Sequence, residues 1–191
     1  MEYKRKYPLF SACGLNCGLC PRYYTKGNSK CPGCGGENFT AKHPPCGVLS
    51  CSQRNSVEYC YLCNEYPCKK YNKWEIDSFI THKNMMRDFE KAKTNGIKVY
   101  QKELNEKIKI LNVLLTNYNN GRQTNLFCIA VNLLELNDIK IVLKQIVKEV
   151  KLKELGIKEK SKIAVNLFKI MAEKRNIKLE LIQKINANGI N

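Results

Sequence analysis

Ten of the eleven cysteines fall between residues 13 and 68, and this clustering constrains the fold more than any other feature of the chain. They occur in the segments CGLNCGLC, CPGC, CGVLSC and CYLCNEYPC. A C-x2-C pair binds metal well because a tight turn directs both sulfurs at one ion. Several such pairs in so short a stretch predict metal binding rather than isolated buried thiols. The candidate ligands are Cys13, Cys17, Cys20, Cys31, Cys34, Cys46, Cys51, Cys60, Cys63 and Cys68.

The spacing of these cysteines provides enough ligands for two zinc ions. Structural zinc sites are closed tetrahedra, and two cysteine pairs complete each of them. Cys13 and Cys68 are then left over, or they replace a member of the longest-spaced pair. The spacing leaves open which cysteines share an ion. The pairs are Cys17/Cys20, Cys31/Cys34, Cys46/Cys51 and Cys60/Cys63.

Iron–sulfur chemistry is the alternative use of these cysteines. A cluster also takes four thiolates, so one cluster in place of one zinc ion accounts for the pattern as well. The C-x3-C-x2-C spacing of Cys13, Cys17 and Cys20 is shared with enzymes that cleave S-adenosylmethionine. Those enzymes need alternating strands and helices behind the loop, whereas further cysteines and then helices follow here. We interpret that match as coincidental.

The N-terminus and the hydropathy pattern indicate a cytoplasmic protein. The first residues are basic, but the apolar stretch behind them is short and runs into the cysteines, unlike a secretory signal. No apolar run approaches the ~20 residues that span a membrane. Thiols stay reduced in the cytoplasm, so we expect metal ligands rather than disulfides.

The composition changes near residue 70, where the cysteines, prolines and glycines give way to lysine- and leucine-rich segments. We expect a mainly α protein, with an irregular metal-stabilised module at residues 1–70 packed on a helical bundle at residues 71–191 as one compact unit. Helical periodicity predicts the helices and Gly96 as a stop, with Asn137 as a cap. The tail at 177–185 predicts a short strand or a frayed helix. The expected helices cover 74–96, 97–118, 125–134, 137–155 and 160–175.

The apolar spacing also predicts which faces of these helices are buried. The 125–134 helix is almost wholly apolar and should be buried on all sides. The inward residues expected in the other helices are Trp74, Phe79, Met85, Met86 and Phe89, then Val99, Leu104, Ile108, Leu111 and Leu115, and finally Ile163, Leu167, Ile170 and Met171.

Residues outside the cysteine cluster offer no recognisable catalytic constellation. The sequence has no phosphate-binding glycine loop, no nucleophile elbow and no convincing carboxylate pair. His43 is interpreted as a loop histidine, and His82 as a surface or boundary residue within a helix. Cys128, in LFCIAV, is expected to be a small buried hydrophobic residue.

The formal charge of +16 raises the question of an acidic partner. Nucleic acid is possible, but nearly all the basic residues are lysines, whereas base recognition favours the arginine fork. A solvated lysine-rich surface explains the charge as well. We therefore favour an unknown protein partner over nucleic acid, and expect no membrane association.

The segments ACGLNCGLC, CPGC, CGVLSC and CYLCNEYPC, with the later GRQTNLFCIAVNLLELNDI, resemble the prokaryotic proteins of domain-of-unknown-function family 3795. The resemblance runs from about Cys13 to Leu181. It implies a cysteine-rich domain that holds zinc, but it supplies no enzymatic activity and leaves the function open. We expect a zinc-binding protein with structural metal sites that acts as a binding or adaptor protein. An iron–sulfur redox or sensor protein is the alternative, and a nucleic-acid-binding zinc protein comes third.

Overall fold

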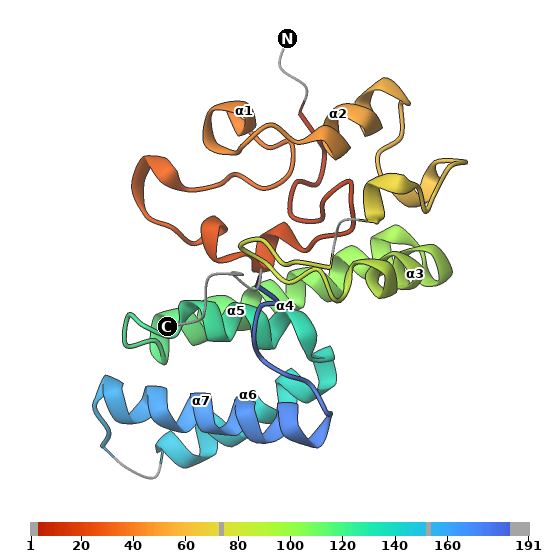
Figure 1. Ribbon diagram of the computed structural model, residues 1–191. Helices are drawn as coiled ribbons and strands as arrows, with labels where there is room; N and C mark the ends of the chain where they lie inside the picture. Colours follow the sequence, from red (N-terminus) through yellow and green to blue (C-terminus); the bar gives the residue numbers. More distant parts are fainter. Residues whose placement is uncertain (1–3, 73–74, 152–153, 184–191) are drawn as a thin grey trace, which may run out of the picture.

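The computed structural model describes residues 4–72, 75–151 and 154–183, and it confirms a mainly α architecture. Seven α-helices and no β-strand occur within these residues. An irregular cysteine-rich region lies on one side of the molecule and the long helices on the other (Figure 1). Within the described part of the chain, no helix has the length and apolar character needed to cross a bilayer.

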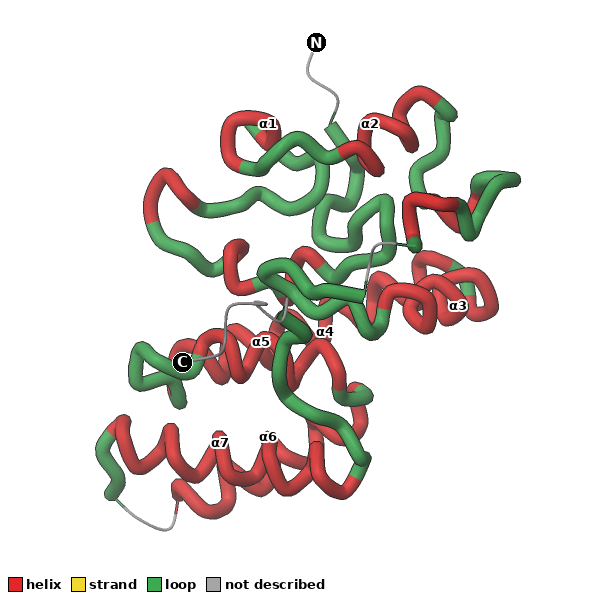
Figure 2. The backbone as a smooth tube through the Cα atoms, viewed as in Figure 1, coloured by secondary structure: helices red, strands yellow, loops and turns green. Residues whose placement is uncertain are grey.

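Turns rather than long helices organise the cysteine-rich region (Figure 2). Its two α-helices are short: α1 (Phe39–Lys42) and α2 (Gly47–Arg54). Each C-x2-C segment at residues 17–20 and 60–63 forms a 3₁₀ turn, in which the amide of the second cysteine donates to the carbonyl of the first at 3.0–3.1 Å. Such tight turns bring neighbouring cysteines to the same side of the backbone. The 3₁₀ turns span Cys17–Leu19, Pro21–Tyr23, Gly27–Ser29, Cys60–Leu62 and Lys69–Tyr71.

Five helices form the bundle, with α4 at its centre. Helix α4 packs against α3, α5 and α6, and α6 and α7 lie side by side (Figure 1). Gly96, with a φ of 88°, separates α3 from α4, because the left-handed backbone there favours glycine. The helices are α3 (Met85–Asn95), α4 (Ile97–Asn117), α5 (Thr124–Leu133), α6 (Leu136–Lys151) and α7 (Ile157–Lys174).

A hydrophobic core is shared by the cysteine-rich region and the bundle. Phe10 and Leu19 are fully buried in the same cluster as Phe89 of α3. The Phe10 ring lies 5.6 Å from the ring of Phe89 and 4.7 Å from that of Tyr100 on α4. Fully burying a side chain of this kind stabilises the fold by ~2–3 kcal/mol. The two regions therefore depend on one another for burial.

A buried polar network also joins the loop between Cys13 and Cys17 to three helices. The Asn16 amide donates to Asp88 Oδ2 of α3 at 2.8 Å and to Asn132 Oδ1 of α5 at 2.9 Å. The hydroxyl of Tyr100 on α4 donates to Asn16 Oδ1 at 2.8 Å. Because an unsatisfied buried polar group costs ~1–3 kcal/mol, these bonds hold the loop in one position on the bundle.

Two ionisable groups accompany this network. Burial raises the pKa of Asp88 and lowers the pKa of Lys107, and each charge partly offsets the effect on the other. The Lys107 ammonium donates to the carbonyl of Leu134 at 2.8 Å. The interior of the bundle is thus polar around Asp88 and Lys107, beneath the loop between Cys13 and Cys17.

The segment before α3 differs from the expected 74–96 helix. Residues 75–84 are not helical, and the helix begins only at Met85. The Asp77 carboxylate accepts from the amides of His82 and Ile182, both at 2.7 Å, which holds the segment against the C-terminal tail. His82 therefore lies in a loop rather than within a helix. Trp74 lies outside the described residues.

The remaining helices confirm the expected elements with shifted ends. Helix α6 begins at Leu136, so Asn137 lies in its first turn and does not cap it. The helix ends at Lys151 rather than near Leu155, and residues 152–153 lie outside the described part. The tail at 177–183 is neither strand nor helix, and the rest of the expected tail element lies outside the described residues. It turns back at Asn176, whose left-handed φ of 54° asparagine tolerates well.

Several expected inward residues are exposed instead. Met85, Phe89, Leu104, Leu111 and Met171 are buried, in agreement with the apolar spacing. Helix α5 is buried over most of its length, as expected. The exposed exceptions are Phe79, Met86, Val99 and Ile170.

Candidate metal centre

The ten clustered cysteines divide between two cavities. We call the first, of about 320 Å³, the six-cysteine cavity. The second, of about 80 Å³, is the four-cysteine cavity. All eleven cysteines of the chain are free thiols. The six-cysteine cavity is lined by Cys13, Cys17, Cys20, Cys31, Cys34 and Cys46, and the four-cysteine cavity by Cys51, Cys60, Cys63 and Cys68.

This division separates one of the expected pairs. Cys46 immediately precedes α2 and lines the six-cysteine cavity, whereas Cys51 lies within α2 and lines the other. Cys68, which the spacing left without a partner, joins Cys51, Cys60 and Cys63. Sequence separation alone could not reveal this, because the short helix between positions 46 and 51 turns the two side chains to different sides.

The sulfurs line shared cavities without meeting at one point. Among the residues that the structure describes, no three His, Cys, Asp or Glu side chains converge closely enough to hold an ion. The cysteines of each group therefore share a cavity and an electrostatic environment, but they do not surround a single point.

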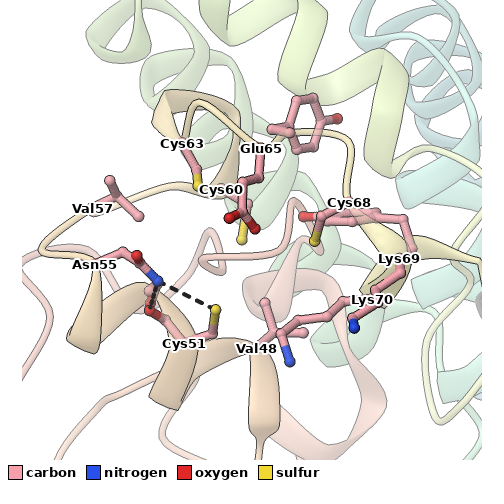
Figure 3. A pocket seen from close by; sticks show the side chains of 13 residues that line it. Val48, Cys51, Asn55, Val57, Cys60, Cys63, Glu65, Cys68, Lys69 and Lys70 are labelled. Carbon is pink, nitrogen blue, oxygen red and sulfur yellow. Dashed lines mark hydrogen bonds between the residues drawn. The ribbon is translucent and has the colours of Figure 1, made fainter.

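The four-cysteine cavity is built from α2 and two 3₁₀ turns. Figure 3 shows the side chains of Cys51, Cys60, Cys63 and Cys68 around this cavity. Cys60 lies close enough to Cys51, Cys63 and Cys68 for their charges to affect its ionisation. The side-chain amide of Asn55 donates to Cys51 Sγ at 3.5 Å and to the Cys51 carbonyl at 2.9 Å (Figure 3).

The six-cysteine cavity has Cys17 near its middle. Cys17 lies close enough to Cys34, Cys13 and Cys20 for their charges to raise its pKa. Cys20 in turn lies near Cys31. Cys46 lies near both Cys13 and Cys34.

Hydrogen-bond donors surround the sulfurs of this cavity. The Ser11 hydroxyl lies 3.0 Å from Cys13 Sγ, and the Leu49 amide donates to Cys46 Sγ at 3.5 Å. Cys20 accepts from the backbone of Arg22 and Tyr23. Sulfurs placed as acceptors in this way suit thiolates, whose negative charge such bonds stabilise.

Burial nevertheless opposes ionisation of these thiols in the metal-free fold. It raises the pKa of Cys13 to about 12 and that of Cys20 to about 11. The pKa values of Cys17 and Cys34 are raised for the same reason, and neighbouring cysteines add to the effect. A bound cation reverses this balance, since a coordinating thiol is deprotonated outright. In their chemistry, though not in their present positions, these thiols are therefore suitable donors for a divalent metal ion.

Two arginines bring positive charge to the six-cysteine cavity. The Arg5 side chain is fully buried beside Cys34 and forms an ion pair with Glu58 at 3.0 Å. Arg22 lies at the other side, near Cys20. Arg22 follows Cys20 by two positions, and this short separation could have indicated that its charge lies near the Cys20 sulfur. Arg5 lies in a basic N-terminal run that resembles an exposed tail, so nothing in the sequence indicated its burial.

Both histidines also line the six-cysteine cavity. His43 Nδ1 lies 2.7 Å from the carbonyl of Pro44, and its ring stacks on Phe39 at 4.5 Å. His82 Nε2 lies 3.2 Å from the Ser78 hydroxyl. The contacts of His43 agree with a loop histidine held by its neighbours. Cys128 is 1% exposed in the core cluster, which confirms its expected burial.

Tyr71 connects the surroundings of the two cavities. Its hydroxyl donates to the carbonyl of Cys13 at 3.2 Å and lies within hydrogen-bonding range of the Cys60 side chain. The amide of Cys60 also donates to the carbonyl of Ala12 at 2.8 Å. The two groups of cysteines are therefore held in one rigidly connected region.

Comparison with known proteins identifies a family for this region alone. Residues 9–73 match the model of the family described as protein of unknown function (DUF3795), and this segment therefore carries that domain. The match includes all ten clustered cysteines, although it ends well before the helical bundle that the resemblance was expected to include. No curated protein and no solved structure gives a significant match.

Proposed function

We propose that this chain is a zinc-binding protein whose cysteines stabilise the DUF3795 domain, and that it acts as a binding or adaptor protein in the cytoplasm. The observation that carries the proposal is the gathering of Cys51, Cys60, Cys63 and Cys68 around one small cavity. Four thiolates complete the tetrahedron of a structural zinc ion and leave no open position for a substrate.

The size of the four-cysteine cavity supports a single ion. Its volume of about 80 Å³ corresponds to ~3 water molecules at their share in the liquid. A mononuclear zinc centre fits that space more readily than a cluster of several iron and sulfur atoms does. The side-chain amide of Asn55 donates a hydrogen bond to Cys51 Sγ, and hydrogen bonds of this kind orient metal ligands from outside the coordination sphere.

A structural role follows from how little regular structure the region contains. Short turns and helices of four and eight residues surround the cysteines. Metal binding contributes folding free energy to such segments, because the site does not exist in the unfolded chain.

A protein partner is preferred over nucleic acid because several arginines are already engaged. Arg5 is buried, Arg175 pairs with Asp138 at 2.6 Å and Arg87 pairs with Glu135 at 3.4 Å. Arg22 lies over the ring of Phe79 at 4.7 Å. These contacts occupy four of the six guanidinium groups that could read base edges.

Metal analysis of the full chain tests the proposal. Protein purified without oxygen should be colourless, and elemental analysis should find at least two zinc ions per chain. A brown protein that contains iron and absorbs near ~400 nm would instead establish the iron–sulfur alternative. Protein without bound metal would refute both.

A further inference from the structure

The six-cysteine cavity contains more thiols than one ion can use. A tetrahedral ion takes four, so a single ion would leave two of the six without a metal. Six thiolates also complete two tetrahedra when two of them bridge the ions, as in the binuclear Zn₂Cys₆ modules. Two observations distinguish these arrangements, and the charge around the cavity is compatible with the binuclear one.

The first observation is the order of the sulfurs. Cys17 and Cys34 lie in the middle, near one another and near Cys13. Cys46 extends this group at one end, through its proximity to Cys13 and Cys34. At the other end, Cys20 lies near Cys17 and Cys31.

This order agrees with the spacing of the two C-x2-C pairs. Each pair contributes one member to the middle of the cavity, Cys17 or Cys34, and one member to the same end, Cys20 or Cys31. A pair with one bridging and one terminal sulfur is what two ions side by side require.

The second observation is volume. The six-cysteine cavity measures about 320 Å³ and the four-cysteine cavity about 80 Å³. These volumes exclude the lining sulfurs and measure the space between them, and the larger cavity has space for more than one ion. Cys17, Cys20 and Cys46 are also half-buried rather than buried, so metal can enter from solvent.

The charge around the cavity is compatible with two ions, and it is equally compatible with one ion and four thiolates, since both carry the same net charge. Two divalent ions with six thiolates carry a net charge of about −2. Arg5 lies beside Cys34 in the middle of the group and Arg22 lies beside Cys20 at one end, so two guanidinium groups lie close to the sulfurs. A buried guanidinium such as that of Arg5 needs a compensating anion, which a thiolate centre supplies in addition to Glu58.

We infer that the six-cysteine cavity holds two zinc ions bridged by Cys17 and Cys34, with Cys13 and Cys46 terminal on one ion and Cys20 and Cys31 terminal on the other. This inference rests on the proposed zinc-binding function. With the ion of the four-cysteine cavity, it gives three ions per chain.

Stoichiometry tests the inference on the full chain. Native mass spectrometry should find three zinc ions, and no cysteine of the two cavities should react rapidly with a thiol reagent while metal is bound. Two ions together with two rapidly reacting thiols would overturn the binuclear centre and leave the zinc-binding function standing. Iron or no metal would overturn the function itself.

A double variant locates the additional ion. Cys20→Ser with Cys31→Ser should reduce the content from three ions to two, whereas the control Cys128→Ser should keep three, since Cys128 lies outside both cavities. A content that stays the same in the double variant and the unaltered chain would contradict the inference.

Cadmium substitution gives a readout that does not depend on how a variant folds. The unaltered chain loaded with ¹¹³Cd should show three resonances, two of which are coupled to each other through bridging sulfurs. Resonances without mutual coupling would refute the bridges.

Discussion

Arg5 lies in the basic stretch KRK at the start of the chain, yet its side chain is buried. Its guanidinium donates to the carbonyl of Phe10 at 2.7 Å and to that of Glu58 at 3.1 Å, and it lies over the Tyr59 ring at 5.0 Å. These contacts join residues more than fifty positions apart. No local pattern could predict them, because the flanking lysine Lys6 has the same charge and is exposed.

Gly18 has a role that the sequence indicated only in part. Gly18 belongs to the segment CGLC, where glycine permits a tight turn, and the structure adds close packing against α4. A Cβ at residue 18 would overlap Cδ1 of Ile108. The requirement comes from tertiary contact, so spacing within the motif could not reveal it.

Gly18→Ala is therefore expected to destabilise the protein by ~1–3 kcal/mol, because the added methyl group forces Ile108 to move. Chemical denaturation of the zinc-loaded chain measures the effect. Gly47→Ala is the matched control, since nothing lies within 4 Å of a Cβ there. Ile108→Val, which removes Cδ1, should restore part of the loss in the double variant. Equal stability of the two alanine variants would contradict this packing.

At the scale of elements, periodicity predicted α4, α5 and α7 well and the segment before α3 poorly. Long amphipathic runs such as that of α4 are the most reliable signal, because helical propensity and burial agree. Residues 75–84 have apolar residues at suitable spacing, but Phe79 is 56% exposed and lies at the mouth of the six-cysteine cavity. The hydrogen bonds of Asp77 to distant amides stabilise a loop there instead.

Asp77→Ala should release this loop from the C-terminal tail. The change removes the acceptor for the amides of His82 and Ile182, and should cost ~1–3 kcal/mol. Hydrogen exchange is the direct measurement: both amides should exchange faster, while amides within α5 should keep their protection. Glu149→Ala, on the exposed side of α6, serves as the control. Unchanged exchange at residues 82 and 182 would show that the carboxylate does not hold the segment.

At the scale of the whole molecule, the sequence located the ten clustered cysteines but not their division between two cavities. Composition separated a cysteine-rich region from a helical one because the two depend on different residue types. The assignment of Cys46 and Cys51 to different cavities depends on the orientation of α2, and the position of Asn16 depends on three helices that follow much later in the chain. Such long-range packing leaves no local pattern.

Removal of metal should therefore affect the molecule as a whole. Stripping zinc with a strong chelator should lower the melting temperature by at least ~10 °C, since the ions bind the folded chain alone and the two regions share a core. Adding zinc back should restore it. An unchanged melting temperature would show that the ions are not structural.

The loss of metal should also depend on pH. Burial raises the pKa of Cys13 to about 12 and of Cys20 to about 11, so these thiols are protonated in the metal-free fold at neutral pH. Each must lose its proton to bind, and the apparent affinity therefore falls as the pH falls. Chelator-induced unfolding should be faster at pH 6 than at pH 8.

Helix α2 has a ligand of one cavity just before its first residue and a ligand of the other within its second turn. If Cys46 binds zinc as proposed, the ion would orient the helix and would thereby place Cys51 for the second centre. Filling either cavity would then lower the entropic cost of filling the other. We therefore expect cooperative loading, in which limiting zinc divides the chains into full and empty molecules rather than spreading the ions evenly.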